Sequence, residues 1–330
     1  MPISPKTDRL KIEIWEQLRT RPYQWLSVSN LASHLELTSQ DLNLSVAELI
    51  NFGFGIEIHP QFGIRYIHPA RRLCPEQIQW QLNTKIVGNS LQVHNRVSST
   101  NDLALQFAQT ESANGTVFLA EEQTKGRGRR GREWFAPASS SLLMSLVLSP
   151  PKPHNDPAFL TALAAVAIGQ VIEPLCVAPV CIKWPNDLYV SEKKIAGILV
   201  EKSNKASVIG VGLNVFISTT EFPPELRSHA TSLQSESRYP IDRSELAKQI
   251  ILAFDRLLHQ SASSGTESLW QWWQMKSGYK GQHVLVSMPD KTLKGKVLDL
   301  HPQNGLVLEN DDGTKTQILS HRIQRIERVF

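Results

Sequence analysis

Three changes of pattern along the 330 residues predict an α+β protein built from three consecutive parts. Apolar residues at helical spacing come first and end in an extended, glycine-punctuated stretch, which predicts a winged helix-turn-helix. Strands and helices then alternate, which predicts a central α/β core on a mixed sheet. Short alternating strands follow and predict a small SH3-like β-barrel. We expect the three parts to occupy residues 1–68, 69–276 and 277–330.

The first part is predicted to contain three helices and two strands. Residues 9–18 and 28–35 carry apolar side chains at mostly helical spacing, and a third helix begins after Thr38. Residues 56–67, with a glycine in the middle, predict a two-stranded ribbon. Residues 69–75, bounded by prolines, are expected to be a linker.

The central part is predicted to contain six strands and three helices. The strands are expected at residues 91–93, 116–121, 141–148, 180–184, 195–201 and 207–215, and the helices at 101–110, 158–175 and 243–260. The tryptophan-rich residues 269–273 are expected to pack into the core, because tryptophan is usually buried. The barrel strands are expected at residues 283–286, 295–301, 306–309 and 316–319.

Composition restricts the class of protein. A chain with 41% hydrophobic residues is long enough to bury a sizeable core, and its net charge of +4 permits contact with nucleic acid without requiring it. Its three cysteines, Cys74, Cys176 and Cys181, lack C-x-x-C spacing. We therefore expect no disulfide framework and no zinc site, and interpret the cysteines as small buried side chains in a reducing cytosol.

No segment predicts secretion or membrane insertion. The N-terminus lacks a charged stretch followed by an apolar core, so no signal peptide is expected. The most apolar segment, residues 160–175, is interrupted by Gly169, Gln170, Glu173 and Pro174, and is too short and broken to span a bilayer. We predict a buried helix there and a cytoplasmic protein without membrane contact.

The most informative motif is G-R-G-R-R-G-R at residues 126–132, called the arginine loop below. Glycines allow the backbone to approach a ligand closely, and exposed N–H groups can form an anion-binding concavity. Arginine adds a permanent charge and a planar donor fork suited to carboxylate and phosphate. The loop by itself leaves two interpretations open, a site for a small anionic ligand or a basic patch on a nucleic-acid backbone.

Polar residues before the loop and at a later strand end extend this pattern. Ser99, Thr100 and Asn101 precede an apolar helix, where they either cap the helix or bind the edge of a polar ligand. Gln123, just before the loop, offers both a donor and an acceptor. Lys183 is expected at a strand end, where it either offsets negative charge on an acyl or phosphoryl oxygen or pairs with Asp187.

Glycines in the last two central strands indicate close backbone approach. Gly197, Gly210 and Gly212 are compatible either with a ligand against the strands or with close strand packing. Asn214, at the end of G-V-G-L-N-V, is a candidate to contact the edge of an adenine.

Five motifs in this order and spacing resemble those of biotin–protein ligases. They are S-T-N, A-E-E-Q-T-K-G-R-G-R-R-G-R, K-W-P-N-D-L, K-I-A-G-I-L-V-E and G-V-G-L-N-V. The resemblance covers nearly the whole chain and is most specific in the core. It corresponds to the long, three-part bacterial form, which joins a winged helix, a ligase core like that of class II synthetases, and an SH3-like cap.

The resemblance implies an ATP-dependent, two-step reaction. Biotin is activated with Mg²⁺-bound ATP as biotinyl-5′-AMP, and is then transferred to one lysine of the biotin carboxyl carrier protein of acetyl-CoA carboxylase. It assigns biotin binding to Ser99, Thr100, Asn101, Gln123, Arg127, Gly128, Arg129 and Lys183, and adenylate binding to Gly126, Arg130, Arg132, Trp134 and Asn214. The resemblance further implies three catalytic residues, Lys183, Arg127 and Arg129. No protein side chain is expected to ligate the metal directly. We also expect a homodimer that is weak or forms only with ligand bound.

Three other functions stay open. A lipoate–protein ligase would share the reaction type, although the arginine loop and K-W-P-N-D favour biotin. A pure DNA-binding regulator, or a ligase that also represses the biotin operon, would use the winged helix. Its expected recognition helix, residues 39–51, contains Asp41 and Glu48 but no lysine or arginine, so DNA binding is expected to be weak or absent. The DNA-contact candidates are Ser39, Gln40, Asn43 and Arg65, with Arg71 and Arg72 as further basic residues.

Overall fold

The computed structural model describes residues 5–109, 113–149, 155–203 and 206–329. The chain forms two compact units. Unit 1 contains Met1–Leu82 together with Pro240–Lys248, and unit 2 contains Asn83–Tyr239 and Gln249–Phe330. The residues that the sequence marks as site candidates, from Ser99 to Asn214, all belong to unit 2.

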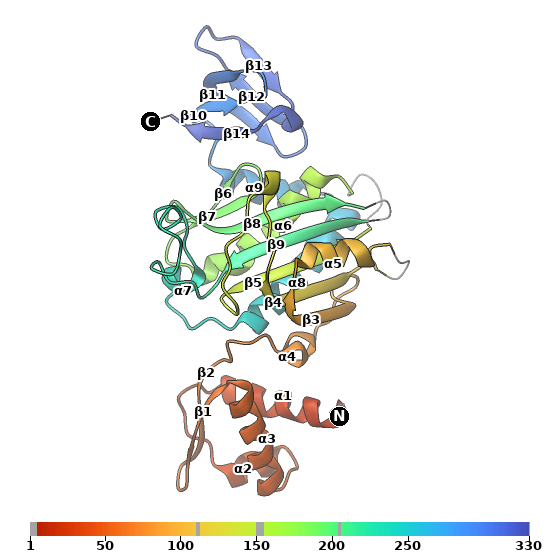
Figure 1. The fold of residues 1–330 in the computed structure, drawn as a ribbon, viewed down its shortest axis with the longest axis vertical. Coiled ribbons are helices and arrows are strands. Elements are labelled where there is room, and N and C mark those ends of the chain that lie inside the picture. Colours follow the sequence, from red (N-terminus) through yellow and green to blue (C-terminus); the bar gives the residue numbers. More distant parts are fainter. Residues whose placement is uncertain (1–4, 110–112, 150–154, 204–205, 330) are drawn as a thin grey trace. The chain divides into compact units, whose positions relative to one another are not determined.

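Unit 1 contains the three expected helices and the expected ribbon, in the expected order (Figure 1). The elements are α1 (Pro5–Arg19), α2 (Val28–His34), α3 (Ser39–Phe52), β1 (Gly55–His59), β2 (Gly63–His68) and α4 (Pro75–Gln79). Helix α3 starts where the sequence predicts, because the Thr38 hydroxyl accepts a hydrogen bond from Asp41 N (3.1 Å). Helix α1 starts earlier than expected, and α4 was not predicted.

A chain segment far away in sequence completes unit 1. The Arg243 side chain is fully buried, and its Nε donates to the Arg71 carbonyl (2.9 Å). Asp242 accepts from Gln77 Nε2 (2.7 Å), and burial raises the pKa of its carboxyl group. The predicted linker, residues 69–75, is therefore held by hydrogen bonds to the beginning of α8 (Arg243–Ser263).

The core of unit 2 is a seven-stranded mixed sheet in the order β3-β4-β5-β9-β8-β7-β6. Its strands are β3 (Ser90–Val97), β4 (Thr116–Gln123), β5 (Ser141–Leu148), β6 (Val180–Lys183), β7 (Asp187–Val190), β8 (Lys193–Lys202) and β9 (Ser207–Asn214). Only β3 and β4 pair in parallel, and the other neighbours are antiparallel. All six predicted strands are confirmed, and β7 is an additional one.

Helices cover both faces of this sheet. In Figure 1, α5 (Thr100–Phe107) lies in front of the sheet and α6 (Pro157–Ile172) lies behind it. Helix α6 and the following turn η2 (Glu173–Leu175) form the one helix among the described residues that is apolar and long enough to cross a membrane. The expectation that this segment is too short and too broken to span a bilayer was therefore wrong, because the helical structure continues through Gly169, Gln170, Glu173 and Pro174. Most of α6 is nevertheless buried in the fold, as predicted for a core helix. Thr110, the expected end of α5, lies outside the described residues.

The rest of unit 2 contains α7 (Leu233–Glu236), most of α8, α9 (Glu267–Ser277) and a second sheet. Trp270 and Trp273 of α9 are buried, which confirms the predicted core packing of this run. The second sheet is antiparallel, in the order β13-β12-β11-β10-β14. Its strands are β10 (His283–Ser287), β11 (Thr292–His301), β12 (Gly305–Glu309), β13 (Lys315–Ile318) and β14 (Arg325–Arg328), the last of which was not predicted.

The cysteines agree only partly with the expectation. All three are free; Cys74 is buried and Cys176 is half-buried, but Cys181 is exposed. The prediction of three buried side chains was wrong for Cys181 because it lies on β6, the edge strand of the sheet, where its side chain points outward. Burial raises the pKa of the Cys74 thiol to about 12, so this thiol stays protonated at neutral pH.

Candidate functional site

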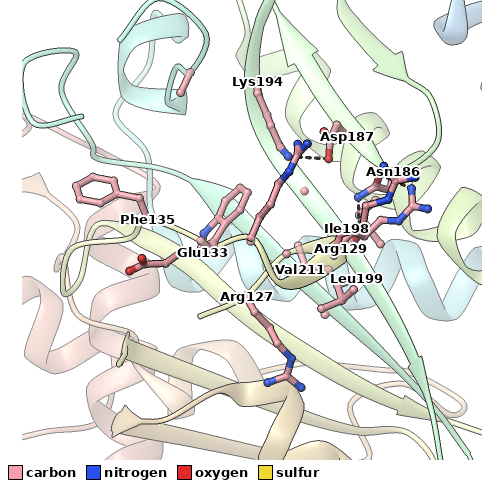
Figure 2. Close-up of a pocket in the computed structure, with 18 of the residues that line it drawn as sticks. Arg127, Arg129, Glu133, Phe135, Asn186, Asp187, Lys194, Ile198, Leu199 and Val211 are labelled. Atoms are coloured by element: carbon pink, nitrogen blue, oxygen red, sulfur yellow. Dashed lines mark hydrogen bonds and ion pairs between the residues drawn. The ribbon is translucent and has the colours of Figure 1, made fainter. Parts of the chain in front are cut away.

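The main candidate site is a cavity of about 610 Å³ in unit 2 (Figure 2). It lies between the beginning of α5, the loop after β4, the turn between β6 and β7, and strands β8 and β9. The cavity is lined by twelve of the thirteen predicted ligand-binding residues: Ser99, Thr100, Asn101, Gln123, Arg127, Gly128, Arg129, Arg130, Arg132, Trp134, Lys183 and Asn214. Gly126, the thirteenth, is buried and does not line the cavity.

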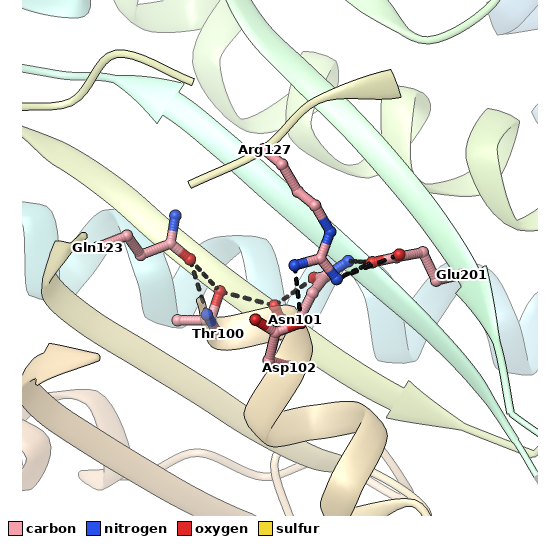
Figure 3. A network of polar contacts seen from close by, with 7 residues as sticks. Thr100, Asn101, Asp102, Gln123, Arg127 and Glu201 are labelled. Carbon is pink, nitrogen blue, oxygen red and sulfur yellow. Dashed lines mark hydrogen bonds and ion pairs between the residues drawn. The ribbon is translucent and has the colours of Figure 1, made fainter. Parts of the chain in front are cut away.

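Four residues, Ser99, Thr100, Asn101 and Gln123, form what we call the polar wall. Gln123 Oε1 accepts hydrogen bonds from Thr100 N (2.7 Å) and Thr100 Oγ1 (2.8 Å), so a side chain of β4 caps α5 (Figure 3). Ser99 occupies the N-cap position, but its side chain makes no capping hydrogen bond. The capping interpretation of this cluster is therefore wrong for Ser99, whose hydroxyl remains available to a ligand.

Asn101 is held from two sides. Its Oδ1 lies 2.6 Å from the donating Ser145 hydroxyl, and its Nδ2 donates to Glu201 Oε2 (2.6 Å). A Cβ at position 210 would lie 2.3 Å from Asn101 Oδ1, so Gly210 is required for this side chain to lie against β9. Asn101 is only 4% exposed, so the polar wall is formed before any ligand arrives.

The arginine loop closes on itself through backbone hydrogen bonds. Gly128 N donates to the Arg132 carbonyl (2.7 Å), and Trp134 N donates to the Gly126 carbonyl (3.0 Å). Inside it, Arg130 adopts a left-handed conformation, with φ of 59°. A Cβ at position 126 would lie 3.0 Å from Gln123 Nε2, so Gly126 brings the loop close to the polar wall.

The loop arginines differ in their partners. Arg127 pairs with Asp102 and Glu201, at 2.7 and 3.0 Å. Arg129 donates to Asn186 Oδ1 (3.2 Å), and its pKa is lowered by loss of hydration and by the charge of neighbouring Arg130. In Figure 2, Arg127 points away from Arg129 and Asn186. The loop therefore does not present four equivalent cations.

Trp134 forms one side of the cavity. A Cβ at position 212 would lie 2.5 Å from Trp134 Cε2, and one at position 197 would lie 3.0 Å from its Cζ3. Both glycines therefore allow the indole ring to lie directly on β8 and β9. The sequence left a ligand or close strand packing open for these glycines, whereas the neighbour that requires the missing Cβ at Gly197 and Gly212 is the side chain of Trp134.

Two lysines line the cavity, and they have different surroundings. The Lys183 Nζ lies 4.8 Å from the centroid of the Tyr189 ring. The Lys194 Nζ lies 2.8 Å from Asp187 Oδ1 and 5.4 Å from the centroid of the Trp134 ring. The ion pair that the sequence suggested for Lys183 with Asp187 is thus made by Lys194, whose place in the site sequence reasoning missed.

The segment after β9 completes the cavity. Phe222, Leu226 and His229 line it, and no sequence pattern indicated them. Asn214 Nδ2 donates to the Thr231 carbonyl (2.9 Å), whereas its buried Oδ1 has no partner among the described residues. This leaves a buried acceptor at the apolar end of the cavity.

The DNA-contact candidates lie in unit 1. Ser39, Gln40 and Asn43 are exposed on α3. The Arg65 side chain pairs with Glu57 and stacks on Trp25, with its Cζ 4.4 Å from the ring centroid. The only basic residue among the four predicted contacts is thus already neutralised by a carboxylate.

The central part of the chain matches a known protein family. The model of the biotin/lipoate A/B protein ligase family matches residues 93–215. The bifunctional ligase/repressor BirA of Bacillus subtilis (strain 168) is 32% identical over 275 residues, covering 82% of this chain and 85% of that protein. The biotin–[acetyl-CoA-carboxylase] ligase of Mycobacterium tuberculosis (strain ATCC 25618 / H37Rv) is 31% identical over 260 residues, covering 76% of this chain and 95% of that protein.

A solved structure has a similar fold. The biotin protein ligase from Aquifex aeolicus in complex with biotin and ATP matches with a TM-score of 0.62 and 26% sequence identity. The match covers 73% of this chain and 100% of that chain.

Proposed function

The chain belongs to the family of biotin–protein ligases, and we propose that its cavity activates biotin with ATP and transfers it to a carrier protein. We propose the biotin carboxyl carrier protein of acetyl-CoA carboxylase as the acceptor, which the name of the Mycobacterium tuberculosis relative, a biotin–[acetyl-CoA-carboxylase] ligase, supports. One observation carries the proposal: the polar wall, the arginine loop and two lysines all line one cavity.

The polar wall is proposed to bind the fused rings of biotin. The ureido group of biotin presents one carbonyl acceptor and two N–H donors, which require complementary groups in a site of fixed shape. Two polar groups of the wall, the Ser99 hydroxyl and Gln123 Nε2, are not used in its internal hydrogen bonds and are therefore available to a ligand. Gln123 Nε2 also lies close to the arginine loop. Thr100 and Asn101 fix these groups in place and complete the wall.

The first step brings two anions together. A biotin carboxylate oxygen attacks the α-phosphorus of ATP, the bond from this phosphorus to the bridging oxygen of the β-phosphate breaks, and pyrophosphate leaves. Arg129 and Lys183, with Arg127 and Gly128, are proposed to hold the carboxylate and the α-phosphate. We add Lys194 from its position between Trp134 and Asp187.

ATP is expected to enter as its Mg²⁺ complex. Glu133 and Asp187 are the only carboxylates that line the cavity among the described residues, and Asp187 is already paired with Lys194. Phosphate oxygens and water would therefore supply most of the ligands of the metal. Arg130 and Arg132 are proposed to hold the triphosphate and its adenylate product, and the buried Gly126 to bring the loop that carries them close to the polar wall.

The adenosine is proposed to lie in the part of the cavity that is lined by Trp134 and Asn214. Trp134 offers a flat apolar surface there, and the unpartnered Asn214 Oδ1 can accept from the exocyclic amine of adenine. In the second step the ε-amine of the carrier lysine attacks the acyl carbon, the bond from this carbon to the phosphate oxygen breaks, and AMP leaves. A closed loop would exclude water from the anhydride until the carrier arrives.

The test combines exchange and transfer. Purified protein with biotin and Mg-ATP should exchange labelled pyrophosphate into ATP in a biotin-dependent manner. Addition of a biotin-carrier domain should then increase the mass of the carrier by one biotinyl group. Lipoate in place of biotin should support neither reaction, and activity with lipoate alone would replace the proposal by a lipoate–protein ligase.

Further parts of the proposal concern domains and assembly. We propose that residues 1–68 form a winged helix-turn-helix, 69–276 the catalytic domain, and 277–330 an SH3-like barrel, in a cytoplasmic, weakly or ligand-dependently dimeric protein. The names of the BirA relatives favour a second role as a repressor. The surface of α3 opposes it, because α3 contains no lysine or arginine.

A further inference from the structure

The carboxylate of Glu201 joins two parts of the site that lie far apart in sequence. It accepts from Asn101 Nδ2 (2.6 Å) in the polar wall, and from Arg127 in the arginine loop, with distances of 3.2 Å to Oε1 and 3.0 Å to Oε2 (Figure 3). Glu201 lies on β8, next to the last residue of the strand, and is only partly exposed. A rigid strand therefore supplies the group that connects wall and loop.

The fork of Arg127 is already occupied. One terminal nitrogen contacts Asp102 (2.7 Å) and the other contacts Glu201. Burial alone would lower the pKa of Arg127, but its hydrogen bonds to Asp102 and Glu201 raise it. Two carboxylates surround one guanidinium, so the cluster carries a formal charge of −1 and is a poor place for a further anion.

Asn101 depends on this cluster for its orientation. Its amide is held between Ser145 and Glu201, and Gly210 leaves just enough space for it against β9. Loss of the Glu201 carboxylate would leave the amide nitrogen of a buried side chain without its acceptor. The orientation of Asn101, and with it the polar wall, would then no longer be determined.

We propose that Glu201 is a positioning residue for biotin, and that Arg127 acts through Glu201 as a strut and not as a binder of the substrate carboxylate or phosphate. The inference rests on the proposed function and revises one role within it. The anions are left to Arg129, to the exposed loop arginines and to the lysines. Asp102, on the first turn of α5, holds the other side of the strut.

A double-mutant cycle tests this division of roles. Biotin affinity of the full-length protein is measured by calorimetry without ATP, for Glu201→Ala, Arg127→Ala and the double variant. We expect Glu201→Ala to weaken biotin binding about tenfold or more, as for the loss of a hydrogen bond to a charged group. Arg127→Ala should weaken it by less, and the double variant should be no weaker than Glu201→Ala.

The KM for ATP provides the second readout. If Arg127 acts only through Glu201, the KM for ATP should change less than about threefold in either single variant, because the anion-binding groups remain. Arg96→Ala is the matched control, since it removes an arginine from an ion pair with Glu122 outside the cavity. Biotin affinity and KM for ATP should both be unchanged in this control.

The outcomes separate cleanly. Fold-changes that multiply in the double variant, or a large rise in KM for ATP with Arg127→Ala, would show that Arg127 binds an anion independently and would overturn the inference. If Glu201→Ala fails to fold by thermal melting, Glu201→Gln replaces it, and Arg127→Ala should still add nothing to it. If wild-type protein neither binds biotin nor exchanges pyrophosphate, the proposed function fails instead.

Discussion

The polar wall and the arginine loop line the same cavity and differ in how firmly their side chains are held. Thr100 and Asn101 are 3% and 4% exposed, and hydrogen bonds within the protein fix both. In the loop, Arg129, Arg130 and Arg132 are exposed, and Arg129 makes a single hydrogen bond to a neutral amide. The polar wall is therefore fixed before a ligand binds, whereas we expect a bound ligand to fix the arginines of the loop.

This difference has a physical cause. A neutral ring is recognised by hydrogen bonds whose geometry must be correct at the outset, because a misplaced buried polar group costs about 1–3 kcal/mol. Anions are recognised by charge, which acts over longer distances and tolerates movement. Exposed side chains that are not fixed by the protein also suit a reaction whose intermediate must be held and later released.

The largest effect is expected for the lysines that face the anions. Lys194→Met and Lys183→Met should each lower the rate of biotinyl-AMP formation, and the larger loss should reach about a hundredfold, as for the loss of one electrostatic donor in an active site. We expect Lys183 to cause the larger loss, because its ammonium has no carboxylate partner among the described residues, whereas the ammonium of Lys194 is already paired with Asp187.

Single-turnover adenylation with saturating biotin and ATP measures this effect. Lys183→Arg and Lys194→Arg should rescue poorly, since the guanidinium is larger and planar. A near-normal rate for Lys183→Met would reduce Lys183 to a surface residue stacked on Tyr189. Near-normal rates for both variants would remove the lysines from the mechanism.

The second prediction distinguishes the polar wall from the part of the cavity beside Trp134, by adding a single methyl group at one place or the other. Gly210→Ala places a Cβ 2.3 Å from Asn101 Oδ1, and Gly212→Ala places one 2.5 Å from Trp134 Cε2. We expect Gly210→Ala to raise the Kd for biotin about tenfold, corresponding to overpacking by 1–3 kcal/mol. Gly212→Ala should mainly raise the KM for ATP.

Calorimetry with biotin and steady-state kinetics with varied ATP give the two numbers. Thermal melting controls for general loss of stability, which both substitutions share because both glycines lie on β9. Identical effects of the two variants on both ligands would mean that the cavity is not divided in the way we describe.

A smaller effect is expected in the loop. Arg129→Gly should speed dissociation of biotinyl-AMP by about tenfold, because one charge-assisted hydrogen-bond fork is lost. The melting temperature should hardly change, since Arg129 is exposed and outside the core. Stopped-flow release of the adenylate measures the rate, and an unchanged rate would remove Arg129 from the retention of the intermediate.

The smallest effect is expected for DNA. Helix α3 lacks basic residues, and Arg65 is paired with Glu57, so promoter binding should stay weak even with biotinyl-AMP bound. Residual binding should fall steeply with salt and discriminate poorly between sequences, and removal of residues 1–72 should leave repression unaffected. Gel-shift titration of promoter DNA with the protein at physiological salt tests this prediction. Nanomolar, sequence-selective binding of the protein to the promoter would establish a ligase that is also a repressor.

Much of the fold was predictable because its signals are local. Helical spacing in α1 to α3 and in α6, and continuous apolar runs in β5 and β9, follow from which side chains avoid water. One missed element is long: α9 has eleven residues, and the sequence analysis predicted only that its tryptophans are buried. The other missed helices and strands are short: β7, β14 and α7 have four residues each, and α4 has five. Such elements form because tertiary neighbours hold them, and their own sequence carries little periodicity.

The site was predictable as a set of residues, and its contacts were not. Twelve of thirteen candidates line one cavity. Phe222, Leu226 and His229 gave no signal, because an apolar or aromatic residue in a loop resembles any other until the fold places it beside a cavity.

The sequence alone determined which chemical groups are present and in what order: the arginine loop, the polar residues before α5, and the glycines of β8 and β9. The tertiary structure decided which of these groups are paired. Arg127 contacts Glu201, which is 74 positions away in the sequence, and Asp187 pairs with Lys194 and not with Lys183. Arg129 forms no ion pair with a carboxylate among the described residues and donates to the amide of Asn186. Ion pairs depend on distances of a few ångströms between segments that only the sheet brings together, and no local pattern encodes those distances.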